Sequence, residues 1–184
     1  MRIIFTILII AISFAFVSAD EVTVRLDRAV FIIPDQESND EASSRIAVHF
    51  SLPEAVNNSD IIYAELHIPL DFTNADIDGD NILEIQARNI TTNWTVENAD
   101  WDGPWTDEGG DLDTTTFYTY TITMDGETDI FMDVTKFVRA VVEDGSDNFG
   151  LMLMPYKYDQ EVFHIYQNAL SEIRTSAQLR VVCK

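Results

Sequence analysis

Basic residues are scarce in this chain of 184 residues, which carries 11 Lys and Arg against 32 Asp and Glu and a formal charge of −21 at pH 7. A surface this acidic repels polyanions, so nucleic acids and anionic membranes are not expected partners. It is compatible with high salt, divalent cations or neutral ligands. The alternative is that the acidity only keeps an exported protein soluble.

Cysteine is almost absent as well, since Cys183 is the only one and lies next to the C-terminus. A single cysteine excludes an internal disulfide. Its thiol either fills a position in the last strand as a small apolar group or pairs with a second molecule. We expect the first arrangement, while self-association through the second stays open.

The sequence also lacks the motifs of common catalytic sites. It has no Gly-x-Ser-x-Gly elbow, no phosphate-binding loop and no cysteine near a histidine. Acid pairs such as Asp100 with Asp102 arise by chance among so many acids, and a small sandwich rarely offers a glycosidase cleft. We therefore expect no enzyme. Metal-ligand spacing is missing around the three histidines, His49, His67 and His164, which we expect to fill strand positions.

Long hydrophobic runs are confined to the start of the chain. Arg2 precedes an apolar stretch over residues 3–17, and small residues at 18–19 form a cleavage site. This pattern is typical of a secretory signal peptide, and the stretch is too short to span a bilayer comfortably. We expect residues 1–19 to be removed and residues 20–184 to form one domain, secreted or at the cell surface, without membrane insertion after cleavage.

Short runs of alternating apolar and polar residues make up most of the remaining chain. In residues 82–88 the apolar side chains of Leu83, Ile85 and Ala87 alternate with polar ones, which indicates a sheet with one face in water. About nine turn-separated strands predict an all-β fold, an antiparallel β-sandwich. The named strands are residues 22–26, 45–50, 61–70, 82–88, 115–124, 149–154, 162–166 and 177–182.

One segment follows a helical spacing instead of a two-residue period, and it predicts one short α-helix. Its apolar stripe is formed by Val134, Phe137, Val138, Val141 and Val142. Asp133 is placed to cap the start of this helix, and Gly145 is placed to close its end.

All three tryptophans lie within residues 93–111, a segment rich in Gly, Asp and Pro. Tryptophan is rarely left exposed without a role, so these rings either pin the loop to a core or present flat apolar faces to a ligand. We expect Trp94 and Trp101 to plug one end of the sandwich. Trp105 is expected to be the most exposed, because residues 103–104 make a turn just before it.

Aromatic rings are the candidate ligand contacts, since flat rings stack on the apolar faces of pyranose sugars. The candidates are Trp105, Trp101, Tyr156 and Tyr158. The competing interpretation is that the tryptophans belong to the core.

Calcium is the only cofactor that the sequence suggests. Oxygen-bearing side chains recur at every second position in Asn74, Asp76, Asp78 and Asp80, as a hard cation requires. The alternative is an ordinary acidic turn, because the Asp78-Gly79 pair is itself a hairpin signal. A second candidate cluster is formed by Asp107, Glu108, Asp111 and Asp113.

Four pieces of the chain, taken in order, resemble a secreted jelly-roll module called the DNRLRE domain, part of which is classed as carbohydrate-binding module family 96. They are the strand pair at residues 44–53 and 61–66, the tryptophan segment with its Pro104-Trp105 and Gly109-Gly110-Asp111 steps, residues 133–135 with 148–153, and the closing residues 163–182. The resemblance implies an exported, noncatalytic jelly roll. Members that bind alginate use basic side chains, which are few here, so alginate specificity is not expected.

The sequence therefore predicts a secreted, noncatalytic module that binds a polysaccharide or another cell-surface component. The alternative is a structural component of an extracellular layer, matrix or filament that packs against copies of itself.

Overall fold

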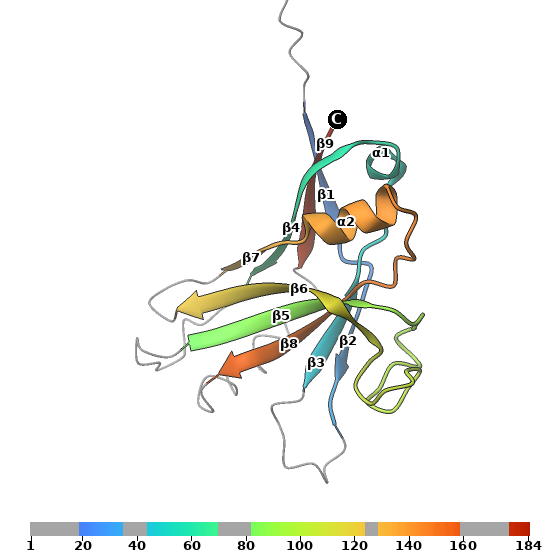
Figure 1. Ribbon diagram of the computed structural model, residues 1–184, viewed down its shortest axis with the longest axis vertical. Helices are drawn as coiled ribbons and strands as arrows, with labels where there is room; N and C mark the ends of the chain where they lie inside the picture. Colours follow the sequence, from blue (N-terminus) through green and yellow to red (C-terminus); the bar gives the residue numbers. More distant parts are fainter. Residues whose placement is uncertain (1–18, 35–43, 70–81, 124–128, 159–176) are drawn as a thin grey trace, which may run out of the picture.

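The computed structural model describes residues 19–34, 44–69, 82–123, 129–158 and 177–184, in which nine strands form two antiparallel sheets (Figure 1). The four-stranded sheet has the order β1 (Asp20–Arg25), β9 (Gln178–Cys183), β4 (Ile61–Pro69) and β7 (Asp129–Asp133). The five-stranded sheet has the order β2 (Arg28–Ile32), β3 (Arg45–His49), β8 (Leu151–Tyr158), β5 (Ile82–Ile90) and β6 (Leu112–Thr123). The predicted all-β sandwich is confirmed.

The order of the strands is that of a jelly roll. β1 pairs with β9 and β3 with β8, so the two ends of the chain lie side by side in both sheets. In the four-stranded sheet β9 also pairs with β4, and β4 pairs with β7. In the five-stranded sheet β8 also pairs with β5, and β5 pairs with β6. β2 is added at the edge of the second sheet and pairs with β3 alone. Without β2, two four-stranded sheets are wound about each other as jelly rolls are.

The main core lies between the sheets and follows from the alternation of each strand. In β9, Leu179, Val181 and Cys183 are buried while their neighbours are exposed or partly exposed. Leu179 pairs in register with Leu66 of β4, which keeps both apolar faces turned inward. The expectation that Cys183 fills a strand position is confirmed, since its thiol belongs to this core.

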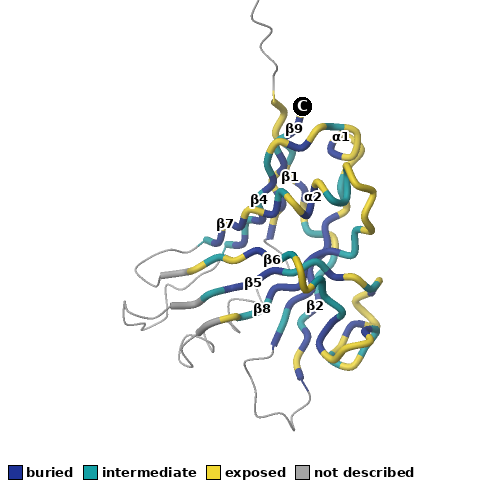
Figure 2. The backbone as a smooth tube through the Cα atoms, in the orientation of Figure 1, coloured by how far each residue is buried: buried dark blue, intermediate teal, exposed yellow. Residues whose placement is uncertain are grey.

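A second core lies on the outer face of the five-stranded sheet. The strands supply Val30, Ile32, Ala47, Ile90 and Met152, and the segment between β5 and β6 supplies Trp94, Ala99 and Trp105. This segment folds back beside β2 and β3 (Figure 1), and it carries buried stretches among its exposed ones (Figure 2). Much of the outer face of the five-stranded sheet is therefore covered as well.

The second core corrects the prediction that β5 has one face in water. Gln86 is only 2% exposed, although it alternates with the inward-facing residues of its strand. It pairs in register with Met154, whose side chain packs against the second core, and Arg88 Nε donates to its Oε1 at 2.6 Å. A buried amide of this kind is stable because it is hydrogen-bonded.

Helix α2 (Thr135–Val142) confirms the predicted helix and buries Phe137 and Val138. Asp133 lies one residue before the N-cap, and its Oδ1 accepts hydrogen bonds from the backbone N–H and hydroxyl of Thr135, at 2.9 and 2.6 Å. Gly145, at a φ of 69°, lets the chain turn after the helix. Neither α2 nor the four-residue α1 (Glu54–Asn57) is long and apolar enough to cross a membrane, and these are the helices of the described ranges.

Three further differences separate the predicted and observed elements. β2 and β7 were not predicted, because β2 is a nearly continuous apolar run and β7 has only five residues. α1 was not predicted either, since a single turn after Pro53 leaves no periodic signal. The predicted strand at residues 162–166 lies outside the described residues.

Candidate functional site

Trp94 is a core residue, as predicted, but it covers the outer face of the five-stranded sheet rather than one end of the sandwich. Its ring is fully buried, and its Nε1–H donates to the carbonyl oxygen of Phe149 at 2.7 Å. The guanidinium of Arg28 lies 4.7 Å from the ring centroid. Because the indole N–H has a partner and the ring has a cation above it, no face of Trp94 is left for a ligand.

The prediction that Trp105 is the most exposed tryptophan is wrong. The ring is 7% exposed, and its Nε1–H donates to the backbone oxygen of Asp100 at 2.7 Å. The same Asp100 accepts hydrogen bonds from the backbone N–H groups of Asp102 and Gly103. The carboxylate of Asp100 thus fixes the turn at residues 100–103. This turn directs Trp105 into the second core instead of into solvent.

Trp101 is partly buried and is held by a cation. The guanidinium of Arg45 lies 5.0 Å from its ring centroid, and Nη1 of the same arginine donates to the carbonyl oxygen of Gly109 at 2.7 Å. Burial, and then the nearby charge of Arg88, lower the pKa of Arg45 below its usual range. Arg45 therefore ties both halves of the tryptophan segment to β3.

The acidic residues of this segment stabilise it internally. One oxygen of Asp111 accepts from the backbone N–H groups of Thr106 and Asp107, and the other accepts from the hydroxyl of Thr92. These hydrogen bonds, with that of Thr92 the largest, lower the pKa of Asp111. A carboxylate whose two oxygens already accept three donors is poorly placed to bind calcium. Within the described ranges, no group of three or more His, Cys, Asp or Glu side chains is arranged around a metal position.

The remaining candidates fall in different places. Tyr156 is more than half exposed, whereas Tyr158 is in β8 with its side chain outside the described residues. The candidate calcium ligands Asn74, Asp76, Asp78 and Asp80, and also His164, lie outside the described residues. The other two histidines each contact a carboxylate and not each other: His49 contacts Asp27 at 2.8 Å, and His67 contacts Asp129 at 3.0 Å.

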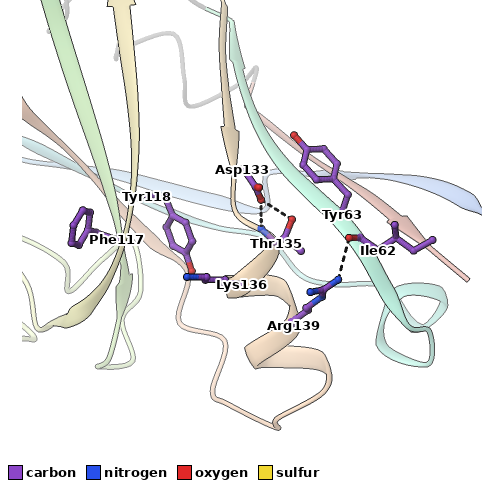
Figure 3. Close-up of a pocket in the computed structure, with 8 residues that line it drawn as sticks. All are labelled: Ile62, Tyr63, Phe117, Tyr118, Asp133, Thr135, Lys136 and Arg139. Atoms are coloured by element: carbon purple, nitrogen blue, oxygen red, sulfur yellow. Dashed lines mark hydrogen bonds between the residues drawn. The ribbon is translucent and has the colours of Figure 1, made fainter.

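A groove opens where the edges of the two sheets part (Figure 3). One side is β6 of the five-stranded sheet, and the other side is formed by β7 and β4 of the four-stranded sheet together with helix α2. Its volume is about 460 Å³, within the range of small-molecule sites. We call it the β6–α2 groove. It is lined by Ile62, Tyr63, Phe117, Tyr118, Asp133, Thr135, Lys136 and Arg139.

Two aromatic residues of β6 border this groove from opposite faces of their strand (Figure 3). Phe117 is 54% exposed and packs against no core, while the guanidinium of Arg88 lies 5.9 Å from its ring centroid. The next residue, Tyr118, turns to the inner face of the sheet and is 7% exposed. The alternation of β6 therefore turns the buried phenol of Tyr118 towards the groove and leaves the open ring of Phe117 on the other face of the same edge strand, at the rim of the groove.

The hydroxyl of Tyr118 is buried and makes no well-formed hydrogen bond with any described residue. Burial raises the pKa of Tyr118 to about 12, although the nearby side chain of Asn89 opposes this rise. A buried hydroxyl whose neighbouring side chain, Asn89, is not in good hydrogen-bond geometry favours a partner that enters from outside. Figure 3 draws Lys136 extending from α2 towards this hydroxyl.

The charged groups of the groove differ in how far they are already engaged. Arg139 donates to the backbone oxygens of Ile61 and Ile62 at 2.7–3.2 Å, so it holds α2 against β4. The hydroxyl of Tyr63 donates to Glu65 at 2.7 Å, and this bond raises the pKa of Tyr63 to about 12. Lys136 is exposed and pairs with no described residue.

Sequence reasoning missed this groove because its residues are far apart in the chain and individually ordinary. The alternation within residues 115–124 puts Phe117 and Tyr118 on opposite faces of their strand, and this was the one available signal that a phenylalanine faces outwards. Nothing in the sequence showed that α2 would lie beside the edge strand that carries it.

No family model and no curated protein matches this chain. The resemblance to the DNRLRE domain stays a prediction, and functional inference rests on the chain's own side chains.

Proposed function

We propose that this chain is an extracellular, noncatalytic module that binds a carbohydrate chain in the β6–α2 groove. The observation that carries the proposal is the exposed ring of Phe117 at the rim of a groove that also holds the unengaged Lys136 and the buried hydroxyl of Tyr118. Flat aromatic rings stack on the apolar faces of sugars, and the polar groups next to them fix orientation. The export signal expected at residues 1–19 is consistent with an extracellular ligand.

The chain offers a matched pair of phenylalanines for the test. Phe117 and Phe131 lie on edge strands of opposite sheets and are 54% and 46% exposed. Phe117 lines the groove, whereas Phe131 stacks on His67 with ring centroids 4.7 Å apart. Phe117→Ala should weaken retention by insoluble polysaccharides and soluble oligosaccharides about tenfold or more, and Phe131→Ala should leave it unchanged. Equal affinity of the two variants, or no glycan binding by the parent chain, would contradict the proposal.

Self-association is the second candidate function, and the open outer face of the four-stranded sheet favours it. The stacked pair of His67 and Phe131 stands on this face, where no cluster of described side chains covers it. A disulfide between copies is disfavoured, because Cys183 is only 2% exposed and β9 would have to open. Analytical sedimentation of the parent chain and of Phe131→Ala tests this candidate. A parent chain that forms a multimer, together with a monomeric Phe131→Ala variant, would support it.

A further inference from the structure

The charge of the β6–α2 groove is nearly balanced, although the whole chain carries −21. Two cations and one carboxylate line the groove, but Arg139 already donates to backbone oxygens of β4 and lies 3.9 Å from Glu143. Lys136 is thus the cation left for a ligand, and Asp133 lies three residues before it in sequence. A single ammonium beside a carboxylate does not make an anion site.

Asp133 keeps the capacity to accept a hydrogen bond. Both contacts with Thr135 use Oδ1, and no described residue donates to Oδ2. The side chain of Asp133 is exposed, so Oδ2 meets solvent at the mouth of the groove. A ligand carboxylate or sulfate there would face this charge in addition to the surrounding acidity of the chain.

Tyr118 adds a neutral donor at the base of the groove. Its phenol stays protonated throughout the physiological range, and its oxygen has no well-formed bond of its own. The groove thus presents an acceptor in Asp133, a donor in Lys136 and a hydroxyl that can do both in Tyr118. A sugar hydroxyl both donates and accepts, whereas a carboxylate accepts only.

We infer that the β6–α2 groove selects an uncharged glycan, with neighbouring hydroxyls of one sugar bridging Asp133 and Lys136 while another sugar of the chain passes over the edge of β6 and stacks on Phe117. This inference rests on the proposed carbohydrate binding and adds the class of sugar. Uronate-containing and sulfated chains are rejected by Asp133 and by the charge of the protein.

Titration calorimetry on the full chain tests this inference with neutral and acidic oligosaccharides of equal length. The neutral probes are cellohexaose, mannohexaose and xylohexaose, and the acidic probes are hexagalacturonate and a sulfated galactan hexamer. We expect at least one neutral probe to bind about tenfold more tightly than either acidic probe, with little dependence on salt.

Two groove variants sharpen the test without disturbing the core. Asp133→Asn keeps an acceptor for Thr135, so α2 should still begin at the same residue. It should lower the ratio of neutral-probe affinity to acidic-probe affinity about tenfold, because the acidic probes should then bind more tightly. Lys136→Met should weaken binding of the neutral probe about threefold to tenfold, because it removes a charged donor and keeps the aliphatic stem.

The outcomes separate the two claims. If an acidic probe binds as tightly as any neutral one, and Phe117→Ala abolishes that binding, the inference of a neutral glycan is overturned while the proposed function stands. If neither class binds, or if binding survives Phe117→Ala, the proposed function fails and the inference fails with it. Neutral selectivity that Asp133→Asn reduces supports both.

Discussion

The tryptophan segment and the β6–α2 groove use similar residue types in opposite ways. In the tryptophan segment, residues 93–111, two indole N–H groups and the carboxylates of Asp100 and Asp111 have partners within the chain. Two of the rings lie beside arginines. At the groove, a phenylalanine ring on the rim is open, a buried phenol has no well-formed hydrogen bond and a lysine is unengaged. Clusters of aromatic and acidic residues therefore indicate a ligand site only when their polar atoms remain unsatisfied.

The two outer sheet faces show the same difference. The five-stranded sheet buries much of its outer face beneath the tryptophan segment, and the four-stranded sheet leaves the stack of His67 and Phe131 partly open. The covered face stabilises the fold. The groove opens at the edge between the two sheets, which the tryptophan segment does not cover.

The largest effect that distinguishes the two regions should come from Trp94→Ala. Loss of a fully buried ring and of its bond to Phe149 should lower the free energy of unfolding by about 3–5 kcal/mol. Urea unfolding measures this, with Val96→Ala, an exposed residue of the same segment, as the control expected to change little. A Trp94→Ala chain as stable as the control would mean that the segment is not part of the core.

A smaller loss is expected from Arg45→Met. The variant keeps the apolar stem but removes the contact with Trp101 and the bond to Gly109, so it should cost about 1–2 kcal/mol. The Trp101 fluorescence should shift towards that of a solvated indole. Arg25→Met, on an exposed position of β1, is the control. Unchanged tryptophan emission and unchanged stability would contradict the role of Arg45 in holding the tryptophan segment against β3.

Acid should weaken the corner that joins β1 to β2. Burial alone would raise the pKa of Asp27, but hydrogen bonds from Ser51 and His49 outweigh it and lower that pKa below the ordinary value. A carboxyl with a lowered folded pKa stabilises the protein above its unfolded pKa of about 3.9, and that contribution disappears as the pH falls through the folded value.

The measurement is the urea midpoint at pH 7 and at steps below pH 4 for the parent chain and for Asp27→Asn. The difference between the two proteins should be present at pH 7 and shrink in the most acidic samples. A difference that grows as the pH falls would show that the sign of the shift is wrong.

The smallest stability change is expected in the groove, where Tyr118→Phe removes a hydroxyl without a well-formed bond. Stability should stay within about 0.5 kcal/mol, while affinity for the neutral glycan should fall about threefold to tenfold. Tyr63→Phe is the counterpart, because its hydroxyl bonds Glu65: stability should fall by about 1 kcal/mol and affinity should change little. The reverse pattern would assign the ligand contact to Tyr63.

Much of the fold follows from periodicity alone. The alternation in β6 and β9 and the helical spacing of Val134, Phe137 and Val138 fix which side chains face the core. β2 escaped prediction because both of its faces are buried, so apolar residues follow one another without alternation. The same cause explains Gln86, a polar residue on a face that the sequence placed in water.

The candidate site was harder to predict because it depends on partners rather than on residue types. Trp105 follows a Gly-Pro turn, which the sequence shows, but the hydrogen bonds of Asp100 decide which way that turn points. Phe117 and Lys136 border one groove only because α2 packs on β4 while β6 lies beside β7. Local sequence carries no record of either contact.

The most direct test of the contrast between the tryptophan segment and the groove is a titration of the ¹⁵N-labelled chain with a neutral hexaose that it binds, followed by two-dimensional NMR. The amide signals of Phe117, Tyr118, Thr135 and Lys136 should move, and the three indole N–H signals should stay in place. Movement of the indole signals of Trp94, Trp101 and Trp105, with the groove amides unchanged, would contradict it.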